Sequence, residues 1–251
     1  GGDVLTEWGT PFWELDMHKG LTMLERAIHS HIITSRYGVP LMLERDQGLV
    51  IEITDGDTLN YRGNLFYDLV KTSVIRLAQG MAEELKGRNI TALALTPGFL
   101  RSEEMLDHFG VTEANWRDGV KTDPHFIASE TPTYIGRAVV ALASDPNVAR
   151  FAGQSLATWT LMHEYNFTDA DGTQPDWGTY FETIVKPTFP EQKDCRNSGN
   201  SRILGPHCSL DLGTKELGNS GNSGNLGTLG TPWELWELWE LGNSGMKMVN
   251  S

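Results

Sequence analysis

Two patterns of hydrophobic and polar positions alternate along residues 1–189. Short, mostly apolar runs occur at residues 49–54, where β-branched residues are frequent, and at 90–95, and such runs are typical of strands buried in a parallel sheet. Residues 154–159 are predicted as the last strand. Longer stretches between them carry apolar residues every three to four positions, which is the spacing of a helix with one apolar face. The alternation predicts an α/β fold with a parallel sheet covered by helices.

Three helices are expected from this spacing. The first covers residues 15–43, with Gly38 and Pro40 disturbing it near its end, and its predicted apolar positions are Leu21, Leu24, Ile28, Ile32 and Ile33. The second covers residues 65–86 and stops at Gly87, and its predicted stripe consists of Phe66, Leu69, Val70, Val74, Leu77, Met81 and Leu85. The third starts at Pro132, a favoured first-turn residue, and runs to Asp145.

The composition changes near Pro190, and residues 190–251 are predicted to be a low-complexity tail. This segment holds 10 of the 27 glycines and repeats Gly-Asn-Ser-Gly at 218–221, 221–224 and 242–245. Trp-Glu-Leu occurs three times in succession over 233–241, and a period of three cannot keep one apolar face on a helix. The preferred interpretation is low-complexity sequence, with a tryptophan-based docking peptide as the alternative. The domain boundary is therefore placed between residues 189 and 190.

Charge and cysteine content limit the classes of partner. The 251 residues carry 20 Lys+Arg against 33 Asp+Glu, a formal net charge of −13, with no basic block. This argues against binding to nucleic acid and to anionic membrane surfaces, which both require positive charge. The sequence contains no apolar run of about 18 residues, the length that a membrane-spanning helix needs. The only two cysteines, Cys195 and Cys208, exclude a disulfide framework and favour a reducing, cytoplasmic compartment.

The central candidate for chemistry is the pair Tyr67 and Lys71, four residues apart at the start of the second helix. This spacing places the phenol and the ammonium on one helix face. Chance alone would give about 0.2 such Tyr and Lys pairs in a chain of this composition, so the pair by itself could be an ordinary surface contact. Its position relative to the predicted strands decides the interpretation. The helix lies between two predicted strands, and open α/β sheets place their sites at the carboxyl ends of strands. Here those ends supply Thr54 and Pro97-Gly98.

At these residues the sequence resembles the short-chain dehydrogenase/reductase family. The family's Tyr-x-x-x-Lys helix matches Tyr67 and Lys71, and a family Ser/Thr hydroxyl about a dozen residues before the Tyr matches Thr54, with Asp55 as the alternative alignment. Residues 97–102 resemble the family's Pro-Gly loop beside the nicotinamide. The resemblance covers about residues 1–185 and includes the segments 48–56 and 167–169.

The resemblance implies a partial Rossmann-like fold and an oxidoreductase that reduces carbonyls or oxidises alcohols with NAD or NADP. It implies that Tyr67 is the acid/base, that Lys71 tunes its pKa and binds ribose, and that Thr54 orients the substrate. Cofactor-binding residues would be Tyr67, Lys71, Pro97, Gly98, Phe99 and Ser102. A Lys71 ammonium about 5 Å from the phenol would favour the phenolate by roughly 3 kcal/mol at an effective dielectric of about 20. The segment 105–129 resembles a substrate lid, and its aromatic residues suggest a small hydrophobic carbonyl or alcohol.

Two departures from the family pattern affect these expectations. No strand is followed by a Gly-rich turn that could cradle a pyrophosphate, so the chain is expected to start after the family's fourth strand and to bind cofactor weakly. The family often has an Asn for a proton relay where this sequence has Ala27, and the relay stays unassigned.

The His and Cys spacings favour no metal site. The alternative to catalysis is a fragment that acts only through association of helices 15–43 and 65–86, which in the family form a homodimer interface.

Overall fold

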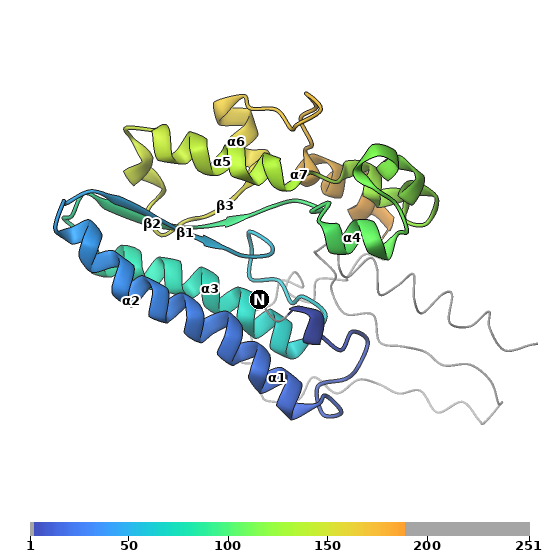
Figure 1. Cartoon of the computed structure of the whole chain (residues 1–251), viewed down its shortest axis with the longest axis horizontal. Coiled ribbons are helices and arrows are strands. Elements are labelled where there is room, and N and C mark those ends of the chain that lie inside the picture. The colour runs from blue at the N-terminus through green and yellow to red at the C-terminus, as the bar shows by residue number, and fades with distance from the viewer. Residues whose placement is uncertain (1–2, 189–251) are drawn as a thin grey trace, which may run out of the picture.

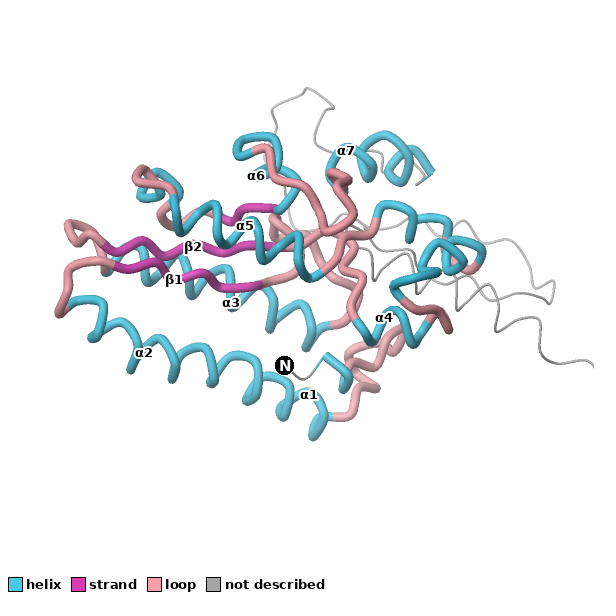
Figure 2. The backbone as a smooth tube through the Cα atoms, turned by 45° about the horizontal axis from the view of Figure 1, so that its top comes forward, coloured by secondary structure: helices cyan, strands magenta, loops and turns pink. Residues whose placement is uncertain are grey.

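The computed structural model describes residues 3–188, so the predicted tail 190–251 lies outside the described residues. Within the described part, a three-stranded parallel sheet forms from β1 (Gly48–Ile53), β2 (Ile90–Thr96) and β3 (Ser155–Ala157) in the order β1-β2-β3. Figure 2 shows the three strands side by side. The predicted α/β fold with a parallel sheet is confirmed, and each strand lies within one residue of its predicted start.

The central strand β2 shows why the two faces of the sheet are covered differently. All seven of its residues are buried. Leu93 and Leu95 point into the largest apolar cluster, whereas Ala92 and Ala94 point to the opposite face. This alternation follows from the two-residue period of a strand. The small alanines allow helix α3 (Leu65–Glu84) to pack closely, with Ile75 and Ala78 against Ala94.

One face of the sheet is covered by α3 and by a long helical segment that precedes β1 (Figure 1). This segment consists of α1 (Met17–Leu24), a π-helical turn (Glu25–His29) and α2 (Ser30–Leu43). The prediction of one long helix over 15–43 is therefore nearly correct. Pro40 lies inside α2 and does not end it, and Gly38 does not interrupt it either.

The opposite face is covered by α5 (Pro132–Ser144) and α6 (Thr158–Tyr165). Pro132 occupies the first turn of α5, as the sequence predicts, and the Thr131 side chain caps the helix. Together with the 3-10 turn Val148–Phe151, these helices enclose the apolar core on this side. Its buried members are Leu93, Leu95, Ala138, Leu142, Phe151, Leu156 and Leu161.

A group of short helices lies beyond the carboxyl ends of the strands (Figure 1). It contains α4 (Glu103–His108), the 3-10 helices Glu113–Lys121 and Pro124–Ala128, α7 (Trp177–Tyr180), a π-helical turn (Phe181–Val185) and a final 3-10 turn (Lys186–Thr188). A separate apolar cluster holds them together, and its buried members are Phe99, Met105, Trp116, Phe126, Trp177 and Val185.

Two predicted apolar faces are less buried than expected. Strand β1 lies at the edge of the described sheet with one neighbour, and most of its residues are half-buried, so the prediction of a fully buried strand was wrong. Along the first helix, Leu21, Ile32 and Ile33 are exposed. The buried positions there are Leu15, Gly20, Met23 and Ala27, and Leu15, Met23 and Ala27 pack in one cluster with residues of α3. No helix within residues 3–188 combines the length and apolarity needed to cross a membrane.

Candidate active site

Tyr67 is held in the first turn of α3 by an N-terminal cap. The side-chain oxygen of Asn64 accepts hydrogen bonds from the backbone N–H groups of Phe66 (3.0 Å) and Tyr67 (3.2 Å). A side-chain oxygen at this position satisfies helix donors that otherwise lack partners. The amide nitrogen of Asn64 donates to the carbonyl of Glu7 at 2.9 Å, which ties the first segment of the chain to the same turn.

The Tyr67 hydroxyl lies just past the end of β1. It donates a hydrogen bond to Oδ2 of Asp55 at 2.7 Å, two residues after the last residue of the strand. Only 2% of Tyr67 is exposed, and its ring packs 5.0 Å from the ring of Trp8. The phenol therefore sits at the carboxyl edge of the sheet, where sites of parallel α/β folds are found.

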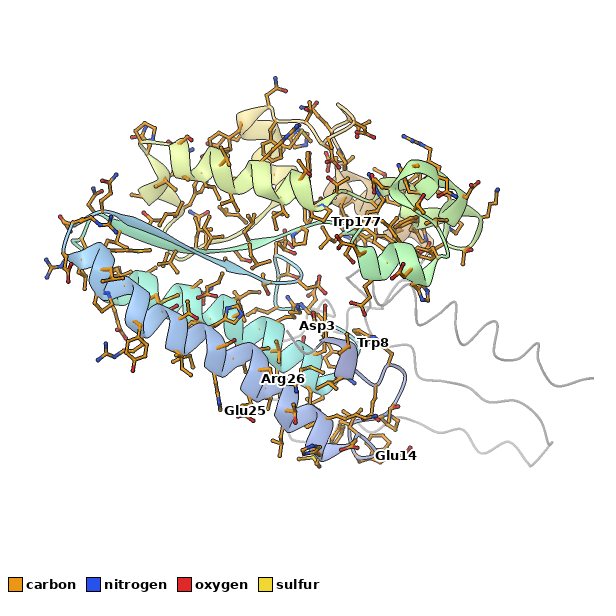
Figure 3. All side chains as sticks on the ribbon, viewed as in Figure 1. Asp3, Trp8, Glu14, Glu25, Arg26 and Trp177 are labelled. Carbon is orange, nitrogen blue, oxygen red and sulfur yellow. The ribbon has the colours of Figure 1, made fainter. Side chains whose placement is uncertain are left out.

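Lys71 lies on the same face of α3 as Tyr67, as the four-residue spacing predicts. Its ammonium is 5.0 Å from the centre of the Tyr67 ring and forms an ion pair with Asp3 at 3.0 Å. Figure 3 shows Asp3 and Trp8 together on the first segment of the chain. The pairing with Asp3 was not foreseen from the sequence, because no local pattern connects residues 68 positions apart.

Thr54 directly follows the last residue of β1. Its hydroxyl donates to the backbone carbonyl of Lys71 at 2.9 Å, and only 3% of the residue is exposed. Thr54 therefore anchors the end of β1 to α3. Asp55, the alternative alignment, supplies the side chain that contacts the phenol. The structure thus brings Asp55 against the phenol, and the substrate-orienting role of Thr54 stays a prediction.

Arg62 fixes the loop that carries Asp55. Its guanidinium is 1% exposed and donates to the backbone carbonyls of Asp55, Thr58 and Asn60. It also pairs with Asp68 in the first turn of α3 at 3.2 Å. A buried charge of this kind needs such a complete set of partners. The loop between β1 and α3 is thereby clamped to the helix that presents Tyr67.

The direction of the Tyr67 pKa differs from the sequence-based expectation. Burial raises the pKa of Tyr67 well above its usual value of 10, and the negative charges of Asp55 and Asp3 raise it further. In this structure burial and the two carboxylates outweigh the lowering expected from Lys71, and the role of Lys71 in tuning the pKa of Tyr67 stays a prediction. Burial also raises the pKa of Asp55, although the nearby Lys71 ammonium and the hydrogen bond from Tyr67 act in the opposite direction.

The Pro97–Ser102 loop follows β2 at the same edge of the sheet. The N–H of Gly98 donates to Oε2 of Glu130 at 3.0 Å, and a Cβ at Gly98 would lie 2.7 Å from Cβ of Trp177. Phe99 is buried in the cluster of the short helices. The hydroxyl of Ser102 caps α4 by accepting from the N–H of Met105 at 3.3 Å.

Among the other predicted loop residues, Pro97 accepts a hydrogen bond at its carbonyl from Thr96. The predicted cofactor-binding residues of this loop therefore all have structural contacts in the protein.

Glu130 is a buried acid that the sequence patterns did not identify. It is fully buried, and its Oε2 also accepts from the Thr158 hydroxyl at 2.8 Å. Its other oxygen has no hydrogen-bond partner within residues 3–188. Burial raises the pKa of Glu130 to about 8. The side chain joins the loop after β2 to the start of α6 after β3.

Ala27 lies in the π-helical turn and packs with Tyr67 in one apolar cluster. Turns of this type frequently occur at functional sites. A methyl group cannot relay a proton, and the nearby His31 pairs instead with the buried Glu52 of β1. The relay therefore remains unassigned at this helix.

The aromatic residues of the predicted lid, residues 105–129, pack mainly against one another. The Phe126 ring lies 4.5 Å from Phe109 and 5.8 Å from Trp116, and Phe126 is fully buried. Trp116 is stacked against the guanidinium groups of Arg101 (4.0 Å) and Arg117 (4.5 Å). These contacts favour the interpretation that the aromatics hold the lid in place over the carboxyl edge.

The described residues fit one end of a nicotinamide dinucleotide. The Tyr67 hydroxyl and the Lys71 ammonium can hydrogen-bond ribose hydroxyls if Lys71 exchanges its pairing with Asp3. No strand within residues 3–188 is followed by a G-x-G-x-x-G turn, so this stretch offers no cradle of that kind for the pyrophosphate. The same stretch contains no cluster of three or more potential metal ligands.

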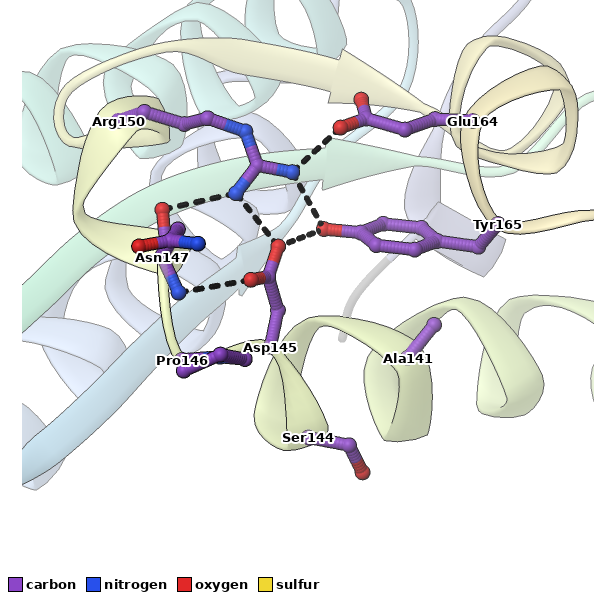
Figure 4. Close-up of a pocket in the computed structure, with 8 residues that line it drawn as sticks. All are labelled: Ala141, Ser144, Asp145, Pro146, Asn147, Arg150, Glu164 and Tyr165. Atoms are coloured by element: carbon purple, nitrogen blue, oxygen red, sulfur yellow. Dashed lines mark hydrogen bonds and ion pairs between the residues drawn. The ribbon is translucent and has the colours of Figure 1, made fainter.

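A hollow lies between the end of α5 and α6, and Figure 4 shows its lining. Arg150 donates there to Asp145, Glu164 and the Tyr165 hydroxyl, and the Tyr165 hydroxyl donates to Asp145 at 2.5 Å. The charges at its base thus pair with one another. The 3-10 turn that carries Arg150 precedes β3, so the hollow is at the amino ends of the strands, away from Tyr67.

Comparisons with known proteins identify a family model and relatives to which the chain is similar. The family model described as short chain dehydrogenase matches residues 4–110. Dehydrogenase/reductase SDR family member 1 of mouse (Mus musculus) is 30% identical over 171 residues, covering 67% of this chain and 54% of the mouse protein. The human (Homo sapiens) protein of the same name is 29% identical over 170 residues, with the same coverage. The chain thus spans about half the length of the curated relatives it matches.

Solved structures resemble the fold at lower identity. A structure of ElxO with NADP bound is 19% identical, with a TM-score of 0.51 and coverage of 61% of each chain. A protein from Xanthomonas campestris is 18% identical, with a TM-score of 0.53, covering 68% of this chain and 60% of that one. At these identities the likeness concerns the fold alone, and it agrees with a Rossmann-like sheet.

Proposed function

Because the chain belongs to the short-chain dehydrogenase/reductase family, we propose that it carries the proton-transfer half of an NAD(P)-dependent carbonyl reduction or alcohol oxidation. The observation that carries this proposal is the placement of the Tyr67 hydroxyl and the Lys71 ammonium on one face of α3, at the carboxyl edge of a parallel sheet. A bound nicotinamide dinucleotide would donate or accept the hydride.

In the reduction direction, Tyr67 gives its hydroxyl proton to the substrate oxygen, and in oxidation the same oxygen accepts the proton of the alcohol. Burial of the ring and the cap at Asn64 hold this oxygen in one position. Positioning of this kind lowers the barrier by removing the need to orient the reacting groups. Lys71 binds the ribose and supplies positive charge beside the phenol.

For the substrate, we favour a small apolar carbonyl or alcohol. The support is the apolar setting of the phenol, whose cluster includes Leu15, Met23, Ala27 and Phe66, with Trp8 packed against it. The lid aromatics add less support than the sequence suggests, since they are used in packing. The low cysteine content supports a reducing, cytoplasmic setting.

A second candidate function is association through the helices that cover one face of the sheet. On the outer face of α2, Ile33, Tyr37 and Leu41 follow one another at four-residue spacing and are 57%, 73% and 56% exposed. Apolar residues spaced in this way form a continuous stripe. Large exposed apolar patches mark association sites. A homodimer through α1, α2 and α3 would cover this stripe and is compatible with catalysis.

The experiment for the proposed reaction compares Tyr67→Phe with the parent chain. The change removes one hydroxyl and keeps the ring packing, so a loss of activity reports proton transfer and not unfolding. We expect turnover of NADH or NADPH with a panel of apolar carbonyls to fall at least about a hundredfold. Tyr61→Phe, an exposed tyrosine in the loop before α3, is the matched control and should keep the parent rate. Equal turnover of Tyr67→Phe and the parent would disprove the assignment.

A further inference from the structure

Asp55 is the hydrogen-bond partner of the Tyr67 hydroxyl, which donates to its Oδ2 at 2.7 Å. The phenol is almost completely buried, so a proton that leaves its oxygen on the protein side passes to this carboxylate. Thr54 cannot take this part, since its own hydroxyl is directed at the backbone carbonyl of Lys71.

Four charged or titratable groups surround the Asp55 carboxyl. Lys71 and Tyr67 approach from α3, Arg62 from the loop and Asp3 from the first segment of the chain. Burial raises the pKa of Asp55 from its usual value near 3.8, whereas Lys71, Tyr67 and Arg62 oppose this rise. The pKa of Tyr67 is raised well above 10. Of the two hydrogen-bonded groups, the phenol is therefore held in its neutral form, and the Asp55 carboxyl is the proton acceptor within hydrogen-bond distance.

We propose that Asp55 is the proton-storing residue of the reaction and that the Tyr67 hydroxyl passes the proton between Asp55 and the substrate oxygen. This inference rests on the proposed function. In alcohol oxidation, the alcohol O–H bond breaks as the Tyr67 oxygen gains that proton, and the original Tyr67 proton moves to Oδ2 of Asp55. The carbon that bears this hydroxyl would give its hydride to a bound oxidised nicotinamide, so the alcohol would lose one proton and one hydride. Asp55 then releases its proton to solvent.

The reduction direction is the exact reverse of these steps. Protonated Asp55 restores the Tyr67 hydroxyl after Tyr67 has protonated the substrate oxygen. Tyr67 then never has to persist as a phenolate, which resolves the difficulty posed by its raised pKa. The arrangement also dispenses with a polar side chain at Ala27 for this first transfer.

The first test measures the Asp55 ionisation directly, without cofactor or substrate. Aspartate side-chain carboxyl carbons are labelled with ¹³C in the full chain and titrated by NMR, and Asp55→Asn identifies the Asp55 signal. We expect its midpoint to lie above the ordinary aspartate value and to rise by about one pH unit or more in Tyr67→Phe, because the donor to the charged form is lost. Tyr61→Phe is the control and should leave the midpoint unchanged. An unchanged midpoint in Tyr67→Phe would overturn the pairing.

The second test follows alcohol oxidation against pH with the oxidised cofactor. The rate should rise with pH and level off at the Asp55 midpoint found by NMR, because the carboxylate is the final base. Asp55→Asn should remove this limb and lower turnover at least about a hundredfold. Asp57 is an exposed aspartate two residues later, and Asp57→Asn should change neither the pH dependence nor the turnover. Parent-like rates in Asp55→Asn would overturn the proposal.

The two tests also separate the proposal from the proposed function. A parent chain without turnover with either NAD or NADP would disprove the proposed function and with it the catalytic role of Asp55. The NMR titration would then still report whether the two side chains share a proton. Turnover that depends on Tyr67 but not on Asp55 would uphold the proposed function and refute only the role of Asp55.

Discussion

The replacement of Glu130 by Gln should stabilise the protein at neutral pH, by an amount that grows with pH. The Glu130 side chain is fully buried, and burial raises its pKa from 4.5 to about 8, with Asp169 adding to the rise and Arg101 opposing it. Glutamine keeps the oxygen that accepts hydrogen bonds from the Gly98 N–H and the Thr158 hydroxyl. It has no proton to lose on unfolding, which is the difference that the experiment measures.

The sign follows from proton binding in the two states. Between pH 4.5 and 8 the folded protein holds the Glu130 proton and the unfolded chain does not, so the free energy of unfolding falls as the pH rises. One pKa unit corresponds to about 1.4 kcal/mol. The parent should therefore lose about 2 to 3 kcal/mol from this group between pH 5 and pH 7, and the loss should level off above pH 8. Below pH 4.5 the contribution is fully retained.

Urea denaturation of the parent and Glu130→Gln at pH 5, 6 and 7 measures this loss. The difference between their unfolding free energies cancels all other titrating groups, and it should grow by about 2 to 3 kcal/mol over the range. Glu44→Gln, an exposed glutamate at the end of α2, is the control and should show no such growth. A difference that stays constant from pH 5 to pH 7 would refute the view that Glu130 is protonated in the folded protein.

Two further predictions concern the cofactor and the oligomer. Isothermal titration of the full chain with NAD or NADP should give a Kd no tighter than about millimolar, roughly −4 kcal/mol, and micromolar binding by the parent would contradict this weak affinity. Asp3→Asn should strengthen cofactor binding, because it frees the Lys71 ammonium. Ile33→Glu should shift sedimentation toward the monomer if the exposed stripe of α2 is a homodimer interface, whereas an unchanged distribution would contradict that role.

The main elements of the fold could be predicted because their signals are local. The apolar runs became β1, β2 and β3, and the helical spacing located α3 and α5 to within two residues of their observed ends. Burial was predicted less well. The outer positions of α2 follow the same periodicity as core positions, so Ile33 could not be distinguished from a core residue by spacing alone.

The candidate site could be predicted only as far as its residues lie on one element. The face shared by Tyr67 and Lys71 follows from helical geometry. Whether Thr54 or Asp55 meets the phenol depends on how the strand ends, because successive side chains alternate in direction, and sequence alignment left a one-residue ambiguity. The ion pair between Asp3 and Lys71 and the contact of Glu130 with Gly98 join distant parts of the chain. No periodicity in the sequence encodes such contacts.

The most direct test of the central claim follows the hydride itself. The full chain is incubated with an apolar ketone and NADH or NADPH that carries deuterium at both C4 positions, and the alcohol product is examined by mass spectrometry. The proposed chemistry predicts one deuterium on the carbinol carbon with the parent and at least about a hundredfold less product with Tyr67→Phe. Product without deuterium, or equal labelled product from both proteins, would contradict the assignment of this chain as an oxidoreductase that acts through Tyr67.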